Sequence, residues 1–322
     1  MKKLFGVKRT LLSMLQCVAL SGLLAGAAFA ADAPKDLVLK GDAACTACHD
    51  EADGPQLLAI GKTKHGTQAD GRTPSCVSCH GESKAHQGFK GSGKPPAPER
   101  IFGKKSKTPA AEQNSACMTC HQKDSKRHLW SGSAHESADV SCASCHSVHA
   151  AHDKVRDKKT QPEVCYACHK EQRAQFNKQS HHPTPEGKVA CSDCHNAHGS
   201  AGPKLMKRDS VVETCYTCHM EKRGPFVHNH RPVSDDCSNC HQPHGATADA
   251  LLKARPPMVC YQCHSGHGTP GVAGIAPAST SIGKANTYIE QARGCLNCHT
   301  EIHGSNNPNG GQNLLPPAFF LR

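Results

Sequence analysis

The sequence predicts a chain that is mostly coil, with short α-helices, little or no β-sheet, and a core that its own side chains cannot supply. Two observations lead to this prediction. Hydrophobic residues make up 37% of the 322 residues and aromatic residues 4%, with a single Trp, which is little apolar material for a soluble domain of this length. A short cysteine motif that recurs along the chain indicates what fills the interior instead.

Ten segments read Cys-x-x-Cys-His, the attachment signature of c-type haem. In one helical turn, residues i and i+3 share a face and i+4 lies beside them, so both thiols can bond to one haem while the His reaches its iron. Haem is large and apolar, so ten of them would form the core. Pro- and Gly-rich stretches such as Gly88–Ala110 and Gly266–Ala285 are expected to be loops between the helical turns. The predicted fold class is therefore a haem-cored multihaem cytochrome c.

Structural zinc is the competing interpretation of paired Cys-x-x-Cys motifs. Zinc does not require a His directly after each pair, yet one follows all ten, which favours haem. The predicted thioether cysteines are Cys45, Cys48, Cys76, Cys79, Cys117, Cys120, Cys142, Cys145, Cys165, Cys168, Cys191, Cys194, Cys215, Cys218, Cys237, Cys240, Cys260, Cys263, Cys295 and Cys298. The predicted proximal iron ligands are His49, His80, His121, His146, His169, His195, His219, His241, His264 and His299.

Fourteen His lie outside the motifs, enough for a second axial ligand on every iron with four to spare. An iron with two protein ligands mostly passes electrons, whereas an open position could bind a substrate. The predicted distal ligands are His65, His86, His135, His149, His182, His198, His230, His244, His267 and His303. This choice leaves His128, His152, His181 and His228 as surface or propionate-contacting residues. His181 against His182, and His228 against His230, remain open, as does the haem that each distal His serves.

The motifs fall into pairs, which predicts five two-haem repeats at about 31–105, 106–157, 158–207, 208–252 and 253–322. His149 follows His146 too closely to wrap around the same porphyrin. We therefore expect such residues to ligate a neighbouring haem and to link successive attachment sites. Met is the main rival as a sixth ligand and would raise the potential, but the His count leaves no need for it, so low potentials are predicted.

Residues 1–30 are predicted to be a cleaved export signal. A basic start at Lys2 and Lys3 precedes an apolar stretch from Leu11 to about Ala27, and Ala28–Ala30 is a small-x-small cleavage site. A retained membrane anchor is the alternative, but the stretch is shorter than the roughly 20 residues that a spanning helix needs. The remaining decahaem domain, 31–322, carries 34 basic and 27 acidic residues, hence 34 − 27 = +7. These charges are scattered between motifs, which suits counter-charge for haem propionates and argues against a nucleic-acid partner.

The ten motifs, with the strings CSDCHNAHGS at 191–200 and CLNCHTEIHGSNNP at 295–308, resemble the MtrA/DmsE family of periplasmic decahaem cytochromes over essentially the whole mature chain. The resemblance implies an elongated molecule with a continuous chain of bis-His haems. It also implies a periplasmic protein held inside an outer-membrane β-barrel porin, with periplasmic or inner-membrane cytochromes at one end. An extracellular multihaem cytochrome or terminal reductase would lie at the other end.

The leading functional hypothesis is electron transfer between the periplasm and the cell exterior, for extracellular metal reduction or oxidation, with the direction of flow left open. A soluble periplasmic shuttle to reductases is the alternative, because it needs no barrel. A multihaem enzyme would show an odd attachment motif or an iron without a sixth ligand, and the sequence predicts neither. Reduction of soluble metal ions at an exposed haem edge would be adventitious.

Overall fold

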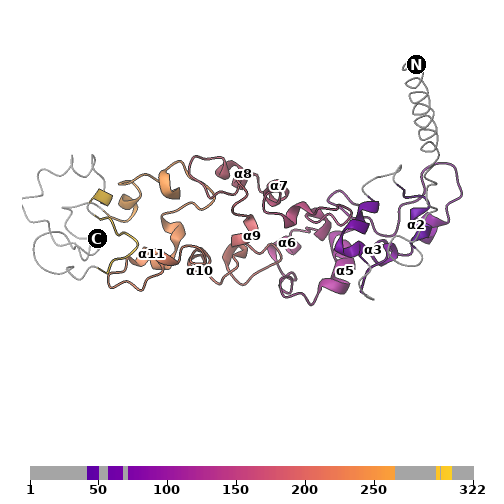
Figure 1. Ribbon diagram of the computed structural model, residues 1–322, viewed down its shortest axis with the longest axis horizontal. Helices are drawn as coiled ribbons and strands as arrows, with labels where there is room; N and C mark the ends of the chain where they lie inside the picture. Colours follow the sequence, from indigo (N-terminus) through magenta and orange to yellow (C-terminus); the bar gives the residue numbers. More distant parts are fainter. Residues whose placement is uncertain (1–41, 51–56, 68–71, 265–294, 298, 307–322) are drawn as a thin grey trace, which may run out of the picture.

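The computed structural model describes residues 42–50, 57–67, 72–264, 295–297 and 299–306. Over these ranges the chain follows one long axis in sequence order, from the indigo helices α2 and α3 at one end to the orange segments beyond α10 and α11 at the other (Figure 1). The elongated shape predicted for the chain is visible in this arrangement. The predicted export signal 1–30, together with Cys298 and His267, lies outside the described residues.

The helices are short, and the longest of those described, α5, has 12 residues. The α-helices are α2 (Ala43–Thr46), α3 (Cys76–His80), α4 (Lys84–Gln87), α5 (Ala110–His121), α6 (Ala134–Ser137), α7 (Gln161–Tyr166), α8 (Lys170–Phe176), α9 (Cys191–Cys194), α10 (Val211–Cys215) and α11 (Arg231–Asp235). The 3₁₀ turns are η1 (Leu58–Lys62), η2 (Lys64–Gly66), η3 (Cys142–Ser144), η4 (Lys154–Arg156), η5 (Pro203–Leu205), η6 (Met220–Lys222), η7 (Cys237–Asn239), η8 (Asp249–Leu251), η9 (Cys260–Gln262) and η10 (Cys295–Asn297). Pairing between extended segments in the described ranges is limited to four isolated bridges, so the prediction of a mostly coil chain with short helices is confirmed.

Each described Cys-x-x-Cys-His motif is one helical turn, as its spacing requires. In eight motifs the backbone N–H of the His donates to the carbonyl of the first Cys at 2.9–3.1 Å, as in Cys45 to His49. The other two motifs lie inside α3 and at the end of α5. This i to i+4 bond places the two thiols on one face with the imidazole beside them.

The apolar core that side chains form is small, as the composition predicts. The buried hydrophobic residues of the described ranges are Trp130, Tyr166, Phe176, Ala190, Val212, Ala246 and Ala248. Three of these seven are alanines, which contribute little area. Within the same ranges, no helix combines the length and hydropathy needed to cross a bilayer.

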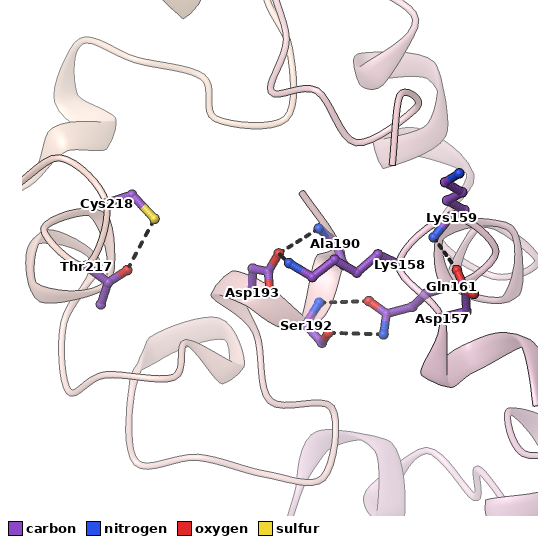
Figure 2. Close-up of polar contacts among 9 residues, drawn as sticks. All are labelled: Asp157, Lys158, Lys159, Gln161, Ala190, Ser192, Asp193, Thr217 and Cys218. Carbon is purple, nitrogen blue, oxygen red and sulfur yellow. Dashed lines mark hydrogen bonds and ion pairs between the residues drawn. The ribbon is translucent and has the colours of Figure 1, made fainter. Parts of the chain in front are cut away.

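A buried polar side chain links the two motifs of a repeat. Gln161, at the start of α7, accepts from the backbone N–H of Ser192 in α9 at 2.9 Å and donates to the Ser192 hydroxyl at 3.0 Å (Figure 2). In the preceding repeat, Asn114 of α5 accepts from the N–H of Cys142 at 2.7 Å. In the first, Asp42 accepts from the N–H of Cys76 at 3.1 Å. The three contacts hold the second helical turn against the first.

Glycine is required where two repeats cross. Gly199 has φ +111°, and a Cβ built on it would lie 2.0 Å from the Leu129 carbonyl oxygen. Gly245, in the equivalent place one repeat later, has φ +155° and would bring a Cβ to 2.0 Å from the Gln175 carbonyl oxygen. A left-handed backbone and a close approach both exclude a side chain at these positions.

Candidate haem-binding sites

Predicted proximal and distal histidines meet in nine pairs across the described residues. In each pair one imidazole belongs to a Cys-x-x-Cys-His motif and the other is one of the predicted distal ligands. The pairs are His49–His86, His65–His121, His80–His149, His135–His169, His146–His198, His182–His219, His195–His244, His230–His264 and His241–His303. Their ring centroids are separated by 5.9–6.3 Å.

This separation fits one iron between two imidazoles. A metal–nitrogen bond of roughly 2 Å on each side, plus about 1 Å from each nitrogen to its ring centre, gives roughly 6 Å between centroids. The angle between ring planes varies from 7° for His49–His86 to 81° for His135–His169. A shared centroid distance with a variable plane angle is the geometry of two ligands that face each other across a common atom.

Almost all of these pairs join different repeats. The His before the second motif of a repeat reaches the first motif of the next one, as His135 does with His169 and His182 with His219. The His after the second motif reaches back to the second motif of the preceding repeat, as in His80–His149, His146–His198, His195–His244 and His241–His303. His149 therefore lies opposite His80 rather than opposite His146, three residues before it.

Only the first repeat pairs internally among the described residues, through His49 and His86. His49 thus faces an imidazole of its own repeat. The tenth motif, Cys295–His299, is the second motif of the fifth repeat. Its proximal His299 is described, whereas the predicted partner His267 lies outside the described residues.

The structure separates the paired histidines from the spare ones where the sequence left two choices. His182 and His230 stand opposite motif histidines. His181 instead bonds through Nδ1 to the Lys178 carbonyl at 2.6 Å and through Nε2 to Glu186 at 3.3 Å. The Lys178 carbonyl and then the Glu186 carboxylate raise the pKa of His181, which favours its protonated form.

Two other spare histidines also have partners away from the pairs. His228 exchanges two backbone hydrogen bonds of 2.9 Å with Ser305. His152 lies with its Nε2 3.5 Å from Asp157.

Nδ1 hydrogen bonds orient the paired rings and leave Nε2 for coordination. His149 bonds to the Leu57 carbonyl at 2.9 Å, His135 to the Ala197 carbonyl at 2.8 Å and His182 to the Pro243 carbonyl at 2.7 Å. Ala197 and Pro243 each immediately precede another paired His, so the support of one pair is built on the backbone of its neighbour.

Burial is the first cause of the pKa shift at four other paired imidazoles. It lowers the pKa of His65, His195, His198 and His244, with smaller contributions from nearby His, Arg or Lys side chains. A lowered pKa keeps the imidazole neutral near pH 7, and the neutral form is the one that binds iron.

The cysteines order the attachment sites along the chain. Within each repeat, the first Cys of one motif interacts with the first Cys of the other: Cys45 with Cys76, Cys117 with Cys142, Cys165 with Cys191, Cys215 with Cys237, and Cys260 with Cys295. Between repeats, the second Cys of each even motif interacts with the second Cys of the next motif: Cys79 with Cys120, Cys145 with Cys168, Cys194 with Cys218, and Cys240 with Cys263. Each site therefore adjoins the sites directly before and after it in the sequence.

The thiols themselves respond to this crowding. The contact with Cys142 is the first cause that raises the pKa of Cys117, followed by burial, and burial is the first cause that raises the pKa of Cys76 to about 12. In the haem-bound chain these sulfurs are thioethers and do not titrate. Their proximity, rather than their acidity, is what carries over to the haem-bound protein.

Several supporting residues give no signal in the sequence. Asp153 accepts from His146 Nδ1 at 2.7 Å, and Leu57 supports His149 from 92 residues away. Gly199 and Gly245 had a signal that could have been used, because a Gly follows directly after His198 and His244. Within the described ranges, no group of three or more His, Cys, Asp or Glu side chains is arranged to hold a metal ion on its own.

Known proteins resemble this chain over most of its length. Residues 76–161 match the family described as cytochrome c-type protein NrfB-like, and 181–224 and 230–269 each match a doubled CXXCH motif. The multiheme cytochrome MtrA of Shewanella baltica is 43% identical over 277 residues, which covers 84% of this chain and 80% of that protein. The cytochrome c-type protein NrfB of Haemophilus influenzae is 34% identical over 40% of this chain and 65% of its own length. NrfB of Escherichia coli is 30% identical over 42% and 69%.

Proposed function

Because the chain belongs to the MtrA family of multihaem c-type cytochromes, and is thus an electron-transfer protein with covalently bound haem c, we propose that it is a ten-haem electron conduit. In this proposal it carries electrons between the periplasm and the cell exterior, for extracellular metal reduction or oxidation. The single observation that carries the proposal is the set of nine facing imidazole pairs.

The proposed ligand set follows these pairs. Each motif His is the proximal ligand of its own haem, and the facing His is the distal ligand. His267 completes the set opposite His299, since it is the one predicted distal ligand left without a described partner. The twenty cysteines of the ten motifs form the thioether bonds. Five two-haem repeats, with the bounds predicted above, then share their ligands with their neighbours.

Haem supplies the one-electron iron couple when it is bound. The protein closes both axial positions with imidazole, which leaves no site for a substrate and directs the chemistry to electron transfer alone. Paired imidazoles without Met favour low potentials. A potentiometric titration centred well above zero would count against this ligand set.

The order of the cysteine contacts supports transfer along the whole length. Every attachment site adjoins the next one, alternately through first and second cysteines, as at Cys117–Cys142 and Cys145–Cys168. Electrons therefore need no detour between sites distant in sequence. The elongated path in Figure 1 extends this order along one axis.

We place the protein in the periplasm, associated with the outer membrane through a β-barrel partner. A coil-rich chain with many polar backbone groups can occupy membrane depth only when other protein surrounds it, and large barrels provide such a lumen. The proposed electron partners are periplasmic or inner-membrane cytochromes at one end and an extracellular multihaem cytochrome or terminal reductase at the other. The alternative is a soluble periplasmic shuttle to reductases.

Two measurements test the proposal. A haem-to-chain ratio for the purified protein is expected to give ten low-spin haems. Native outer membranes, solubilised in mild detergent and resolved as intact complexes, are expected to stain for haem at the position of a large β-barrel. Recovery of the chain only in the soluble periplasmic fraction would replace the conduit with the shuttle. A substantial high-spin fraction would instead reject the bis-His assignment.

A further inference from the structure

The proximal His of the second motif in each of the first four repeats finds its Nδ1 acceptor on the segment that follows the motif. In three repeats that acceptor is a backbone carbonyl. These are His80 with Arg100 at 2.9 Å, His195 with Lys204 at 3.0 Å, and His241 with Ala250 at 2.7 Å. In the second repeat His146 meets a carboxylate instead, Oδ2 of Asp153, at 2.7 Å.

In the third and fourth repeats, the residues that provide this carbonyl lie in an unfavourable backbone conformation. Lys204 and Leu205, and likewise Ala250 and Leu251, are consecutive non-glycine residues with φ between 52° and 59°. Such left-handed residues are unfavourable, by roughly 1 kcal/mol each, and persist where the surrounding structure holds them. Here the left-handed turn presents the Lys204 or Ala250 carbonyl to the imidazole.

The second repeat lacks this turn and uses a side chain in its place. Asp153 lies at the start of η4 and is held from two sides, since its Oδ1 also accepts from the Ser147 N–H at 3.3 Å. The side chain of Asp153 is 19% exposed and that of His146 is 33% exposed. The contact is therefore largely shielded from solvent, where a charge-assisted hydrogen bond is stronger than a neutral one.

A coordinated imidazole whose Nδ1–H bonds to a carboxylate donates electron density to the iron more strongly than one whose Nδ1–H bonds to a carbonyl. Stronger electron donation by the ligand stabilises the oxidised iron more than the reduced iron. We infer that Asp153 gives the haem held by His146 and His198 the lowest reduction potential of the four second-motif haems of the first four repeats. This inference rests on the proposed ligand set.

Nearby cations could offset the effect, and Lys104 acts on Cys145, in the same motif as His146. Arg127 acts on His198, the facing ligand of the same pair. However, its guanidinium is already paired with the Asp124 carboxylate. Asp153 is the one of these three charges that bonds directly to an imidazole of the pair, so its effect on that haem is expected to be the largest.

The position of this haem gives the inference a consequence for transfer. It is the fourth of ten in the order set by the cysteine interactions, between Cys117 on one side and Cys168 on the other. One electron passing along the chain moves from reduced to oxidised iron at each step, with no bond broken and no proton required. A low potential at the fourth site would separate the first three haems from the last six as two electron reservoirs.

The test compares full-length Asp153→Asn with Asp157→Asn by potentiometric titration, followed in the visible region and by EPR. Asn keeps an oxygen acceptor for His146 but removes the charge. Asp157 carries the same charge four residues later and contacts His152, which is not a proposed ligand. In Asp153→Asn, one haem of ten is expected to shift about tenfold in its reduction equilibrium, or 59 mV, toward easier reduction, and its ferric EPR component to change.

No shift in Asp153→Asn, or an equal shift in Asp157→Asn, would overturn the inference. If Asp153→Asn binds fewer than ten haems, the pair Asp153→Glu and Asp153→Gln makes the same comparison of charge at matched size. Ten low-spin haems in every variant keep the proposed ligand set intact, whatever the potentials do. High-spin haem in the unchanged protein would reject that ligand set instead, so the two failures are distinguishable.

Discussion

Replacement of His149 by Ala tests the pairing between repeats directly. His149 faces His80 with ring centroids 6.2 Å apart and bonds to Leu57 at 2.9 Å, and both partners belong to the first repeat. The substitution removes one of the two axial ligands of one haem in ten, so about one-tenth of the reduced haem is expected to bind carbon monoxide. In addition, loss of the hydrogen bond to Leu57 is expected to lower the free energy of unfolding by about 1 kcal/mol.

The measurement is the carbon monoxide difference spectrum of the reduced protein, scaled to total haem. His152→Ala is the matched control, because His152 lies three residues further along and its side chain is 63% exposed. His198→Ala opens a different proposed pair, so the double variant His149→Ala/His198→Ala is expected to bind about twice as much. If His149→Ala binds no carbon monoxide, or if His152→Ala binds as much, the assignment of His149 to the haem of His80 is refuted.

Three further predictions concern the backbone and the links within repeats, and each is checked by thermal unfolding of the haem-loaded protein. Gly199→Ala is expected to lower the free energy of unfolding by about 2 kcal/mol more than Gly93→Ala does. Both glycines have φ +111°, but only at Gly199 would a Cβ collide with the backbone. Equal losses of stability in the two variants would show that the left-handed φ alone matters. Gln161→Ala is expected to lower the free energy of unfolding by about 2 kcal/mol. Ser192→Ala is expected to lower it less, because this variant keeps the bond from its backbone N–H to Gln161. A larger loss of stability in Ser192→Ala than in Gln161→Ala would contradict this reasoning. Lys204→Asn is expected to raise the free energy of unfolding by about 0.5 kcal/mol, because Asn tolerates φ +52° better than Lys does. A lower midpoint of thermal unfolding in this variant would contradict the presence of strain at this turn.

Much of the candidate site could be predicted because its chemistry depends on local spacing. Each described Cys-x-x-Cys-His motif forms one helical turn, and nine of the ten histidines predicted as distal ligands face a motif His in the structure. Proximity in sequence also predicts that His149 does not serve the haem of its own motif, and in the structure His149 faces His80. These predictions need only the geometry of a few consecutive residues.

The rest depends on contacts that no local pattern encodes. The pairing of His135 with His169 requires the path of the chain between repeats. The role of Asp153 follows from a segment that lacks the left-handed turn of the next repeats, and an acid at that position is indistinguishable in sequence from a solvated one. The sequence left the choice between His181 and His182 open, and the contact of His181 with Glu186 gives a physical reason for the difference between them.

The exchange of ligands between repeats bears on how a chain of this kind can change length in evolution. In the proposed ligand set, the second repeat supplies His149 to the repeat before it and His135 to the repeat after it, and it receives one ligand from each side. Duplication of such an interior unit preserves complete coordination throughout, because each copy presents the same two connections to its neighbours. Loss of a terminal unit would instead leave an iron in the neighbouring unit with only one proposed protein ligand. Gain or loss of whole interior units is therefore expected to be tolerated better than loss of the first repeat, in which His49 faces His86 of the same repeat.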